Sequence, residues 1–383
     1  MLPLFLAALA NVIGLGVIVP LLPFYAGNAG ATPQQIAWLF AAFSLAQFLT
    51  APLWGRLSDR VGRKPIIVIS FAGAAVAYLW LAHAGGLAEI FAARILGGVM
   101  NGWLATSHAY IADTTTPDRR ARGMGFIGAA FGVGFVIGPA LGGYLVGGAA
   151  PNFQLPMMIA AGGSMVALAV AVIGIREPAQ HEGSAKARVR LQEVTAAAPI
   201  FAVMLALHFC LFFVFSGMES TFALWCDHVL GMGPRQVGYY LAFAGVCGAF
   251  VQGWLVGRLV ARMGEPMVFC IAVVTLAAGL AILPTTGTRP MLLLPIALLS
   301  IGFGLANPSL LSLMSRAAPN AIRGGALGLS QSAASFGRIL GPTWGGFAFA
   351  AVGVAWPFYS GALMLGPVLV LSFILLKRFE RAG

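Results

Sequence analysis

One face of the apolar run 199–227 carries residue types that could bind a proton and an organic cation. Its members are His208, Phe212, Phe215, Glu219 and Phe222. Spacings of three and four residues place side chains on one face of an α-helix. Loss of water around a carboxyl group favours its protonated form, and aromatic rings beside it suit a lipophilic cation. The pattern predicts that Glu219 exchanges a proton. The alternatives are an acid paired for structural reasons and an acid that reaches the outer interface.

A second group of polar residues lies in the run 88–111. Arg94, Asn101 and His108 follow one another at intervals of seven residues, or two helical turns, so they should share a face. An arginine inside an apolar helix is costly and is expected to face the protein interior or a cavity. The structural alternatives are an arginine bound to backbone carbonyls and a neutral, packed histidine.

Further polar residues are expected in the same cavity. Gln331 and Arg338 lie on one face of the run 322–350, and Arg338 could neutralise an acid that the sequence does not specify. Asn11 and Gln47 are polar residues in the first two apolar runs. We predict that all four line a substrate cavity.

The elements that hold these residues must cross a membrane. Of the 383 residues, 60% are hydrophobic and 9% are charged, against about 25% charged in soluble domains. A span needs about 20 apolar residues, and long unbroken runs indicate helices rather than barrel strands. We therefore predict an all-α protein with twelve transmembrane helices, at roughly 3–25, 35–54, 66–84, 88–111, 122–147, 155–175, 199–227, 235–256, 266–284, 291–314, 322–350 and 355–376.

The net charge of +11 is a topology signal. Eighteen of the 22 Lys and Arg residues fall in loops or termini on one side of the predicted helices. Such loops face the cytoplasm, which predicts that both termini lie inside the cell. This placement argues against nucleic acid as a partner.

The chain also repeats itself. Gly55-Arg-Leu with Arg60 and Gly62 returns as Gly257-Arg-Leu with Arg262 and Gly264, and the second signature described below returns at nearly the same offset. Parallel repeats with substrate between them are a known transporter design. We predict a six-helix half over 1–175, a cytoplasmic linker over 176–197 and a pseudo-symmetric half over 198–383.

Two glycine-rich motifs carry a family resemblance. The segment 55–65 resembles the cytoplasmic signature loop of the major facilitator superfamily, and its members Gly55, Asp59, Arg60, Gly62 and Arg63 are expected to form a cytoplasmic gate. The second motif resembles that of drug:proton antiporters in the same superfamily; it comprises Gly134, Gly138, Pro139, Gly142 and Gly143. Small residues allow close helix contact, and Pro139 kinks the helix.

The N-terminal half is most similar to the tetracycline-efflux branch, on the evidence of the segments 14–23 and 111–115. That branch carries acids in spans 1 and 3, where this sequence has Asn11 and Ala77. The resemblance also implies a role for Arg94 near the proton pathway, because an Arg followed by glycines in span 4 is a further family signature.

The resemblance implies a proton-coupled antiporter that exports a small lipophilic or cationic compound by alternating access. The alternative is a major facilitator transporter of a metabolite, sugar or lipid, and the least expected is a membrane sensor or enzyme. We expect no enzyme activity, no cofactor besides the proton gradient, no metal site and a monomer in the inner membrane. The four cysteines are expected to be packing residues.

Overall fold

Membrane-length helices make up most of the computed structural model, which describes residues 1–147, 151–178, 200–318 and 323–380. In this part of the chain, nine helical stretches have the length and mean hydropathy of a membrane span. One of them, Pro234–Thr285, has 52 residues, or about 78 Å of helix, which is enough for two crossings. The broken helix over 87–114 and the more polar α13 (Arg323–Phe347) complete the twelve predicted spans.

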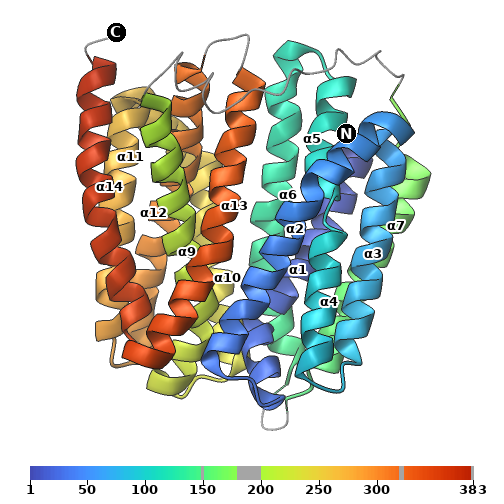
Figure 1. The fold of residues 1–383 in the computed structure, drawn as a ribbon, viewed down its shortest axis with the longest axis horizontal. Helices are drawn as coiled ribbons and strands as arrows, with labels where there is room; N and C mark the ends of the chain where they lie inside the picture. The colour runs from blue at the N-terminus through green and yellow to red at the C-terminus, as the bar shows by residue number, and fades with distance from the viewer. Residues whose placement is uncertain (148–150, 179–199, 319–322, 381–383) are drawn as a thin grey trace. The chain divides into compact units, whose positions relative to one another are not determined.

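The first of two compact units comprises Met1–Ala185 and Met232–Gly245. Its helices are α1 (Leu2–Asn28), α2 (Pro33–Val61), α3 (Arg63–Ala82), α4 (Leu87–Val99), α5 (Trp103–Thr114), α6 (Pro117–Leu145), α7 (Gln154–Gly174) and the start of α10 (Pro234–Phe250). Within it α1 packs against both α6 and α7, and α7 also packs against α3 (Figure 1). Its core includes Phe71 and Trp103, whose ring centroids are 5.6 Å apart.

The second unit comprises Lys186–Gly231 and Val246–Gly383. Its described helices are α9 (Ile200–Leu230), α11 (Val256–Ile282), α12 (Leu293–Ala317), α13 and α14 (Trp356–Glu380), with π-helical turns at Val251–Leu255 and Ala348–Val352. Within this unit α9 packs along α13, and α11 packs against α12 and α14. Most of the predicted linker, at 179–197, lies outside the described residues.

The predicted repeat forms the same turn in both copies. Gly62 separates α2 from α3 with φ 104° and ψ 164°, and Gly264 interrupts α11 with φ 75° and ψ 158°. A positive φ is readily adopted by glycine because it has no Cβ. The two glycines are 202 residues apart, so the sequence offset corresponds to a repeated backbone geometry. The expected loop between 256 and 266 is therefore a single-residue kink in a long helix.

Span 4 differs from the prediction, because the expected continuous helix 88–111 is interrupted between Val99 and Trp103. The backbone oxygen of Val99 accepts hydrogen bonds from Thr50 Oγ1 at 3.2 Å and from Trp54 Nε1 at 2.5 Å. Side chains of α2 thus satisfy a carbonyl at the interruption, as backbone groups within a bilayer require. Asn101 lies in the interruption, so Arg94 and His108 belong to different helices.

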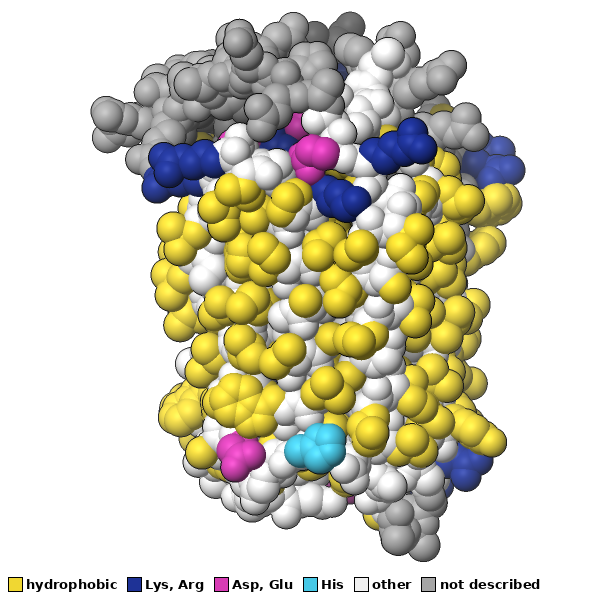
Figure 2. Space-filling model, turned by 90° about the vertical axis from the view of Figure 1, so that its right-hand side faces the viewer, with side chains coloured by type: hydrophobic (Ala, Val, Ile, Leu, Met, Phe, Trp, Pro, Cys, Tyr) yellow, Lys and Arg dark blue, Asp and Glu magenta, His cyan; other side chains and the backbone are white. Residues whose placement is uncertain are grey.

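The surface has the distribution expected of a multi-pass membrane protein. Figure 2 shows a face on which hydrophobic side chains cover the middle, while Lys and Arg gather towards one end. Exposed Leu49, Val76 and Ile173 belong to this class of apolar surface residue. Contact with hydrocarbon explains why such large side chains remain outside the core.

Candidate functional site

Glu219 and Arg338 interact electrostatically in the second unit. Glu219 is partly buried in α9, about three turns before the helix ends at Leu230. Arg338 of α13 also donates from Nη2 to Ser335 Oγ at 3.1 Å, and its Cζ lies 4.8 Å from the centre of the Phe212 ring. Arg338 therefore lies against the predicted aromatic face, and Glu219 is an acid whose charge acts on it.

His208 is enclosed by oxygen atoms from two other helices. Its Nε2 lies 3.2 Å from Asn307 Oδ1 of α12, while its Nδ1 lies 2.8 Å from Ser330 Oγ and 3.1 Å from the Ser330 carbonyl oxygen. The side chain is fully buried. Both ring nitrogens of His208 therefore have polar neighbours.

An aromatic cluster lies between these polar groups. Phe303 of α12 stacks on Phe215 with centroids 3.8 Å apart and meets Phe212 edge-on at 5.4 Å. Phe222, by contrast, is 3% exposed and belongs to the packed core. Gln331 is exposed on α13, about two turns before Arg338.

The predicted site residues of the first unit have separate partners. The side chain of Arg94 is buried, and its Cζ lies 4.3 Å from the centre of the Phe43 ring in α2. Asn11 Oδ1 accepts a hydrogen bond from Ser164 Oγ of α7 at 3.2 Å. Gln47, Asn101 and His108 are partly buried at intermediate positions.

Arg63 is the centre of the predicted gate. Its Nη1 contacts Asp59 Oδ1 at 2.5 Å and Ser58 Oγ at 2.7 Å, and its Nε contacts Asp113 Oδ2 of α5 at 2.8 Å. Asp59 therefore pairs with an arginine of its own motif. Gly55 is partly exposed and Arg60 exposed on the same helix.

Glu177 joins this network from beyond the end of α7. Its carboxylate accepts hydrogen bonds from the backbone N–H groups of Arg63 at 2.5 Å and Lys64 at 2.8 Å. These are the first N–H groups of α3, which lack partners within the helix and favour a negative charge. A Cβ at Gly62 would lie 2.7 Å from Glu177 Cδ. Glu177 falls in the predicted linker 176–197, and its role as a cap leaves no local pattern in the sequence because its partners lie 114 and 113 residues away.

The glycine motif of α6 brings its backbone against that of α1. An added Cβ at Gly138 would lie 2.6 Å from Gly16 Cα, and one at Gly142 would lie 2.6 Å from the Val17 carbonyl oxygen. On the same helix, a Cβ at Gly143 would lie 3.2 Å from Gly238 Cα, in the part of α10 that belongs to this unit. The glycines are therefore required by close approach of backbones.

The repeated motif makes the equivalent contact in the second unit. An added Cβ at Gly337 would lie 2.7 Å from the Phe209 carbonyl oxygen, and one at Gly345 would lie 2.8 Å from that of Gly217. An added Cβ at Gly341 would lie even closer to the α9 backbone, at the Phe213 carbonyl oxygen. Ser216 Oγ of α9 also donates a hydrogen bond to the Gly337 carbonyl at 3.1 Å. Each copy of the motif thus joins its own pair of helices.

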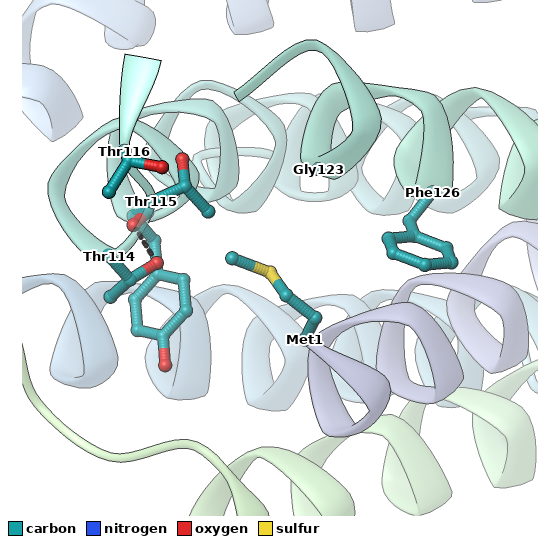
Figure 3. A pocket seen from close by; sticks show the side chains of 7 residues that line it. Met1, Thr114, Thr115, Thr116, Gly123 and Phe126 are labelled. Atoms are coloured by element: carbon teal, nitrogen blue, oxygen red, sulfur yellow. Dashed lines mark hydrogen bonds between the residues drawn. The ribbon is translucent and has the colours of Figure 1, made fainter. Parts of the chain in front are cut away.

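A cavity of about 450 Å³ lies apart from these groups, beside the end of α5 and the start of α6 (Figure 3). Tyr110, Phe126 and three consecutive threonines line it, and the Thr114 hydroxyl donates to the Tyr110 carbonyl oxygen at 2.7 Å. Its lining contains none of the predicted site residues.

Comparison with known families identifies the architecture. The model of the Major Facilitator Superfamily matches residues 4–342. The chain belongs to the Major Facilitator Superfamily. As a major facilitator it is a membrane transporter of small molecules and not an enzyme, and the duplicated glycine contacts are part of a major facilitator fold.

Similar major facilitators include resistance proteins of bacteria. The chain is 27% identical to multidrug resistance protein 2 of Bacillus subtilis, with 94% of this chain and 92% of that protein covered. It is 30% identical to the class G tetracycline resistance protein of Vibrio anguillarum, with 90% and 89% covered. A bacterial homologue of the lysosomal transporter Spinster, solved in an inward-facing, occupied conformation, has the same fold, with a TM-score of 0.82, 18% identity, and 99% and 97% covered.

Two residues of α12 that contact His208 and Phe215 were not predicted from the sequence of this major facilitator. Asn307 and Phe303 lie in an apolar run whose neighbours gave no pattern. A polar side chain inside a span is a sufficient signal to single out Asn307. The contact of Phe303 with Phe215 depends on how α12 meets α9, which no local spacing encodes.

Proposed function

We propose that this facilitator is a proton-coupled antiporter that exports small lipophilic cations by alternating access. The observation that carries the proposal is the partly buried Glu219 on the face of α9 that also bears Phe212 and Phe215, with Arg338 Cζ 4.8 Å from the centre of the Phe212 ring. Exchange needs a group that accepts a proton in one state and interacts with substrate in the other. A carboxylate at an aromatic surface can do both, because an organic cation stabilises its ionised form.

The substrate class follows from the charges and rings that are present. Among the relatives, one is named for multidrug resistance and another for tetracycline resistance. Asn11 is neutral and bound to Ser164, and no group of His, Cys, Asp or Glu suited to a metal occurs among the described residues. These features favour a lipophilic cation over a metal chelate as the exported compound.

The remaining roles belong to the same proposal. The six-helix halves over 1–175 and 198–383 alternate access to Glu219, and the proton gradient supplies the energy. Arg63, Asp59 and Asp113 stabilise one conformation from the cytoplasmic side of an inner membrane, and Arg94 positions a proton-carrying group. The protein works as a monomer with both termini inside the cell.

Export of ethidium, a fluorescent lipophilic cation, tests the proposal in cells. Glu219→Gln should abolish export that a protonophore inhibits in the parent, while expression remains normal. Glu89→Gln is a matched control, because Glu89 is an exposed acid at the start of α4. Loss of export in both variants, or undiminished proton-driven export by Glu219→Gln, would refute the assignment.

A further inference from the structure

We propose that Arg338 is a specificity-determining residue: its guanidinium occupies the position of the substrate cation on the Phe212 ring, and a lipophilic cation binds by displacing it. This inference rests on the proposed export of lipophilic cations and deepens it, because it names the ring that the cation uses and the group that it must move. The contacts that carry it all lie within the second unit, between α9, α12 and α13.

The Phe212 ring has a cation against it. Arg338 Cζ lies 4.8 Å from the ring centre, within the distance of about 6 Å at which an aromatic ring attracts a positive charge. Phe215 and Phe303 instead stack on each other, with centroids 3.8 Å apart and an angle of 19° between their planes, so each covers one face of the other. A cation that enters this cluster therefore competes with the guanidinium for the Phe212 ring.

Neighbours from two helices hold the Phe212 ring in position. His208 lies one turn earlier on α9, with its ring centroid 5.1 Å away, and Phe303 of α12 lies 5.4 Å away; both meet Phe212 at a steep angle. His208 is itself fixed by oxygen atoms of Asn307 and Ser330. Phe212 is partly exposed. The ring is therefore a preformed surface that stays in place when the guanidinium leaves.

The backbone of Arg338 is fixed, whereas its guanidinium can move. Gly337 places α13 directly against α9, because a Cβ there would lie 2.7 Å from the Phe209 carbonyl oxygen and 2.9 Å from Phe212 Cβ. The Arg338 side chain is partly exposed, and its Nη2 donates to the neutral hydroxyl of Ser335 at 3.1 Å. A hydrogen bond to a neutral group is weaker than one to a carboxylate. Displacement therefore needs a side-chain rotation and no movement of α13.

This exchange selects among cations. A guanidinium is planar, delocalised and weakly hydrated, and it stacks well on aromatic rings. A small, strongly hydrated ammonium ion is therefore a poor competitor for its position. An organic cation whose charge is spread over an apolar body gains contact area with Phe212 and loses little hydration. Arg338 thus lowers the affinity for every cation, and those that still bind are lipophilic.

Equilibrium binding of tetraphenylphosphonium to the purified full chain in detergent tests the exchange without a proton gradient. Arg338→Gln should bind this cation about tenfold more tightly, which is the size of a partly desolvated cation–π contact. Arg338→Lys keeps the charge but stacks less well, so it should gain part of that factor. Arg258→Gln is the matched control and should not change the affinity, because Arg258 Cζ lies 4.1 Å from the centre of the exposed Trp254 ring.

Phe212→Leu separates competition for the ring from repulsion between charges. Without the ring there is no contact to compete for, so adding Arg338→Gln to Phe212→Leu should not tighten binding. Repulsion by the charge of Arg338 would still be relieved in that double variant. A gain of affinity that persists in Phe212→Leu therefore overturns the inference.

Two further results would also overturn it. One is unchanged or weaker binding by Arg338→Gln at a normal thermal midpoint. The other is equal affinity of the parent and Arg338→Lys, which decides the question alone if Arg338→Gln does not fold. Tighter binding by Arg338→Gln, in a protein whose Glu219→Gln variant still exports ethidium by the proton gradient, would instead support the exchange and refute the proposed role of Glu219.

Discussion

Arg63 and Glu265 occupy equivalent positions in the duplicated chain and carry opposite charges. Each directly follows a glycine with positive φ, Gly62 or Gly264. Arg63 Nε contacts Asp113 Oδ2, and Glu265 Oε2 contacts Arg316 Nη1, both at 2.8 Å. The two partner residues, Asp113 and Arg316, are 203 residues apart in the sequence. The duplication thus preserves the position of an ion pair while reversing its polarity.

The charges of Glu265 and Arg316 can be swapped in a double variant. Glu265→Arg alone places two arginines together and should lower the thermal midpoint of the detergent-solubilised protein. The double variant Glu265→Arg/Arg316→Glu should recover most of the loss, which we expect to be about 1 kcal/mol because Arg316 is largely exposed. Recovery will be incomplete, since Ser312 donates to Glu265 at 3.2 Å. A double variant no more stable than the single one would contradict the pairing.

Asp59→Asn tests the proposed gate. Asp59 is 65% exposed, so loss of its pair with Arg63 should cost at most about 1 kcal/mol of stability. The variant should insert normally and lose most ethidium export, because the closed arrangement loses a charge. Asp113→Asn removes the other carboxylate from the same arginine and should have a similar effect. If these variants export normally at normal expression, the segment 55–65 is not a gate and only determines the membrane topology.

Gly138→Ala tests the close contact of α1 and α6. The new methyl group would lie 2.6 Å from Gly16 Cα, which is backbone and cannot rotate away. Overpacking of this kind typically costs about 1–3 kcal/mol, so both thermal stability and export should fall. Gly128→Ala, on the same helix with nothing within 4 Å of the added atom, is the control. Equal behaviour of the two variants would show that the motif is not selected for packing.

The proposed orientation can be tested by labelling single cysteines in intact cells. The distribution of Lys and Arg places residue 186 inside the cell and 228–234 outside. Val229→Cys, at a position 43% exposed, should react with an impermeant thiol reagent, and Lys186→Cys should not. The four native cysteines must first be shown to be unreactive. Labelling of position 186 from outside would invert the topology.

The sequence predicted those features that depend on local composition and on repetition. Long apolar runs identified the spans, and the common offset of the repeated segments corresponds in the structure to equivalent backbone turns at Gly62 and Gly264. The contact of the glycine motif with another helix was also expected, since close packing is the main reason for glycines in such a helix.

The predictions failed or were incomplete where distant segments determine the structure. The helical spacing of Arg94, Asn101 and His108 predicted one continuous face, but Trp54 and Thr50 stabilise an interruption between Val99 and Trp103. Their hydrogen bonds come from α2, about 45 residues earlier. Glu177 and Asn307 were likewise missed because their partners are 114 and 99 residues away.

The contact between Gly16 and Gly138 also has a mechanical consequence. Where backbones touch, no flexible side chain lies between them that could adjust its rotamer as the helices slide. A shift of α6 along α1 would bring Gly138 against the next turn of α1. Small displacements are therefore resisted, and the two helices behave as one rigid body. The contact of Gly345 with Gly217 does the same for α13 and α9. A conformational cycle in this protein must therefore move α1 with α6, and α9 with α13, as indivisible pairs.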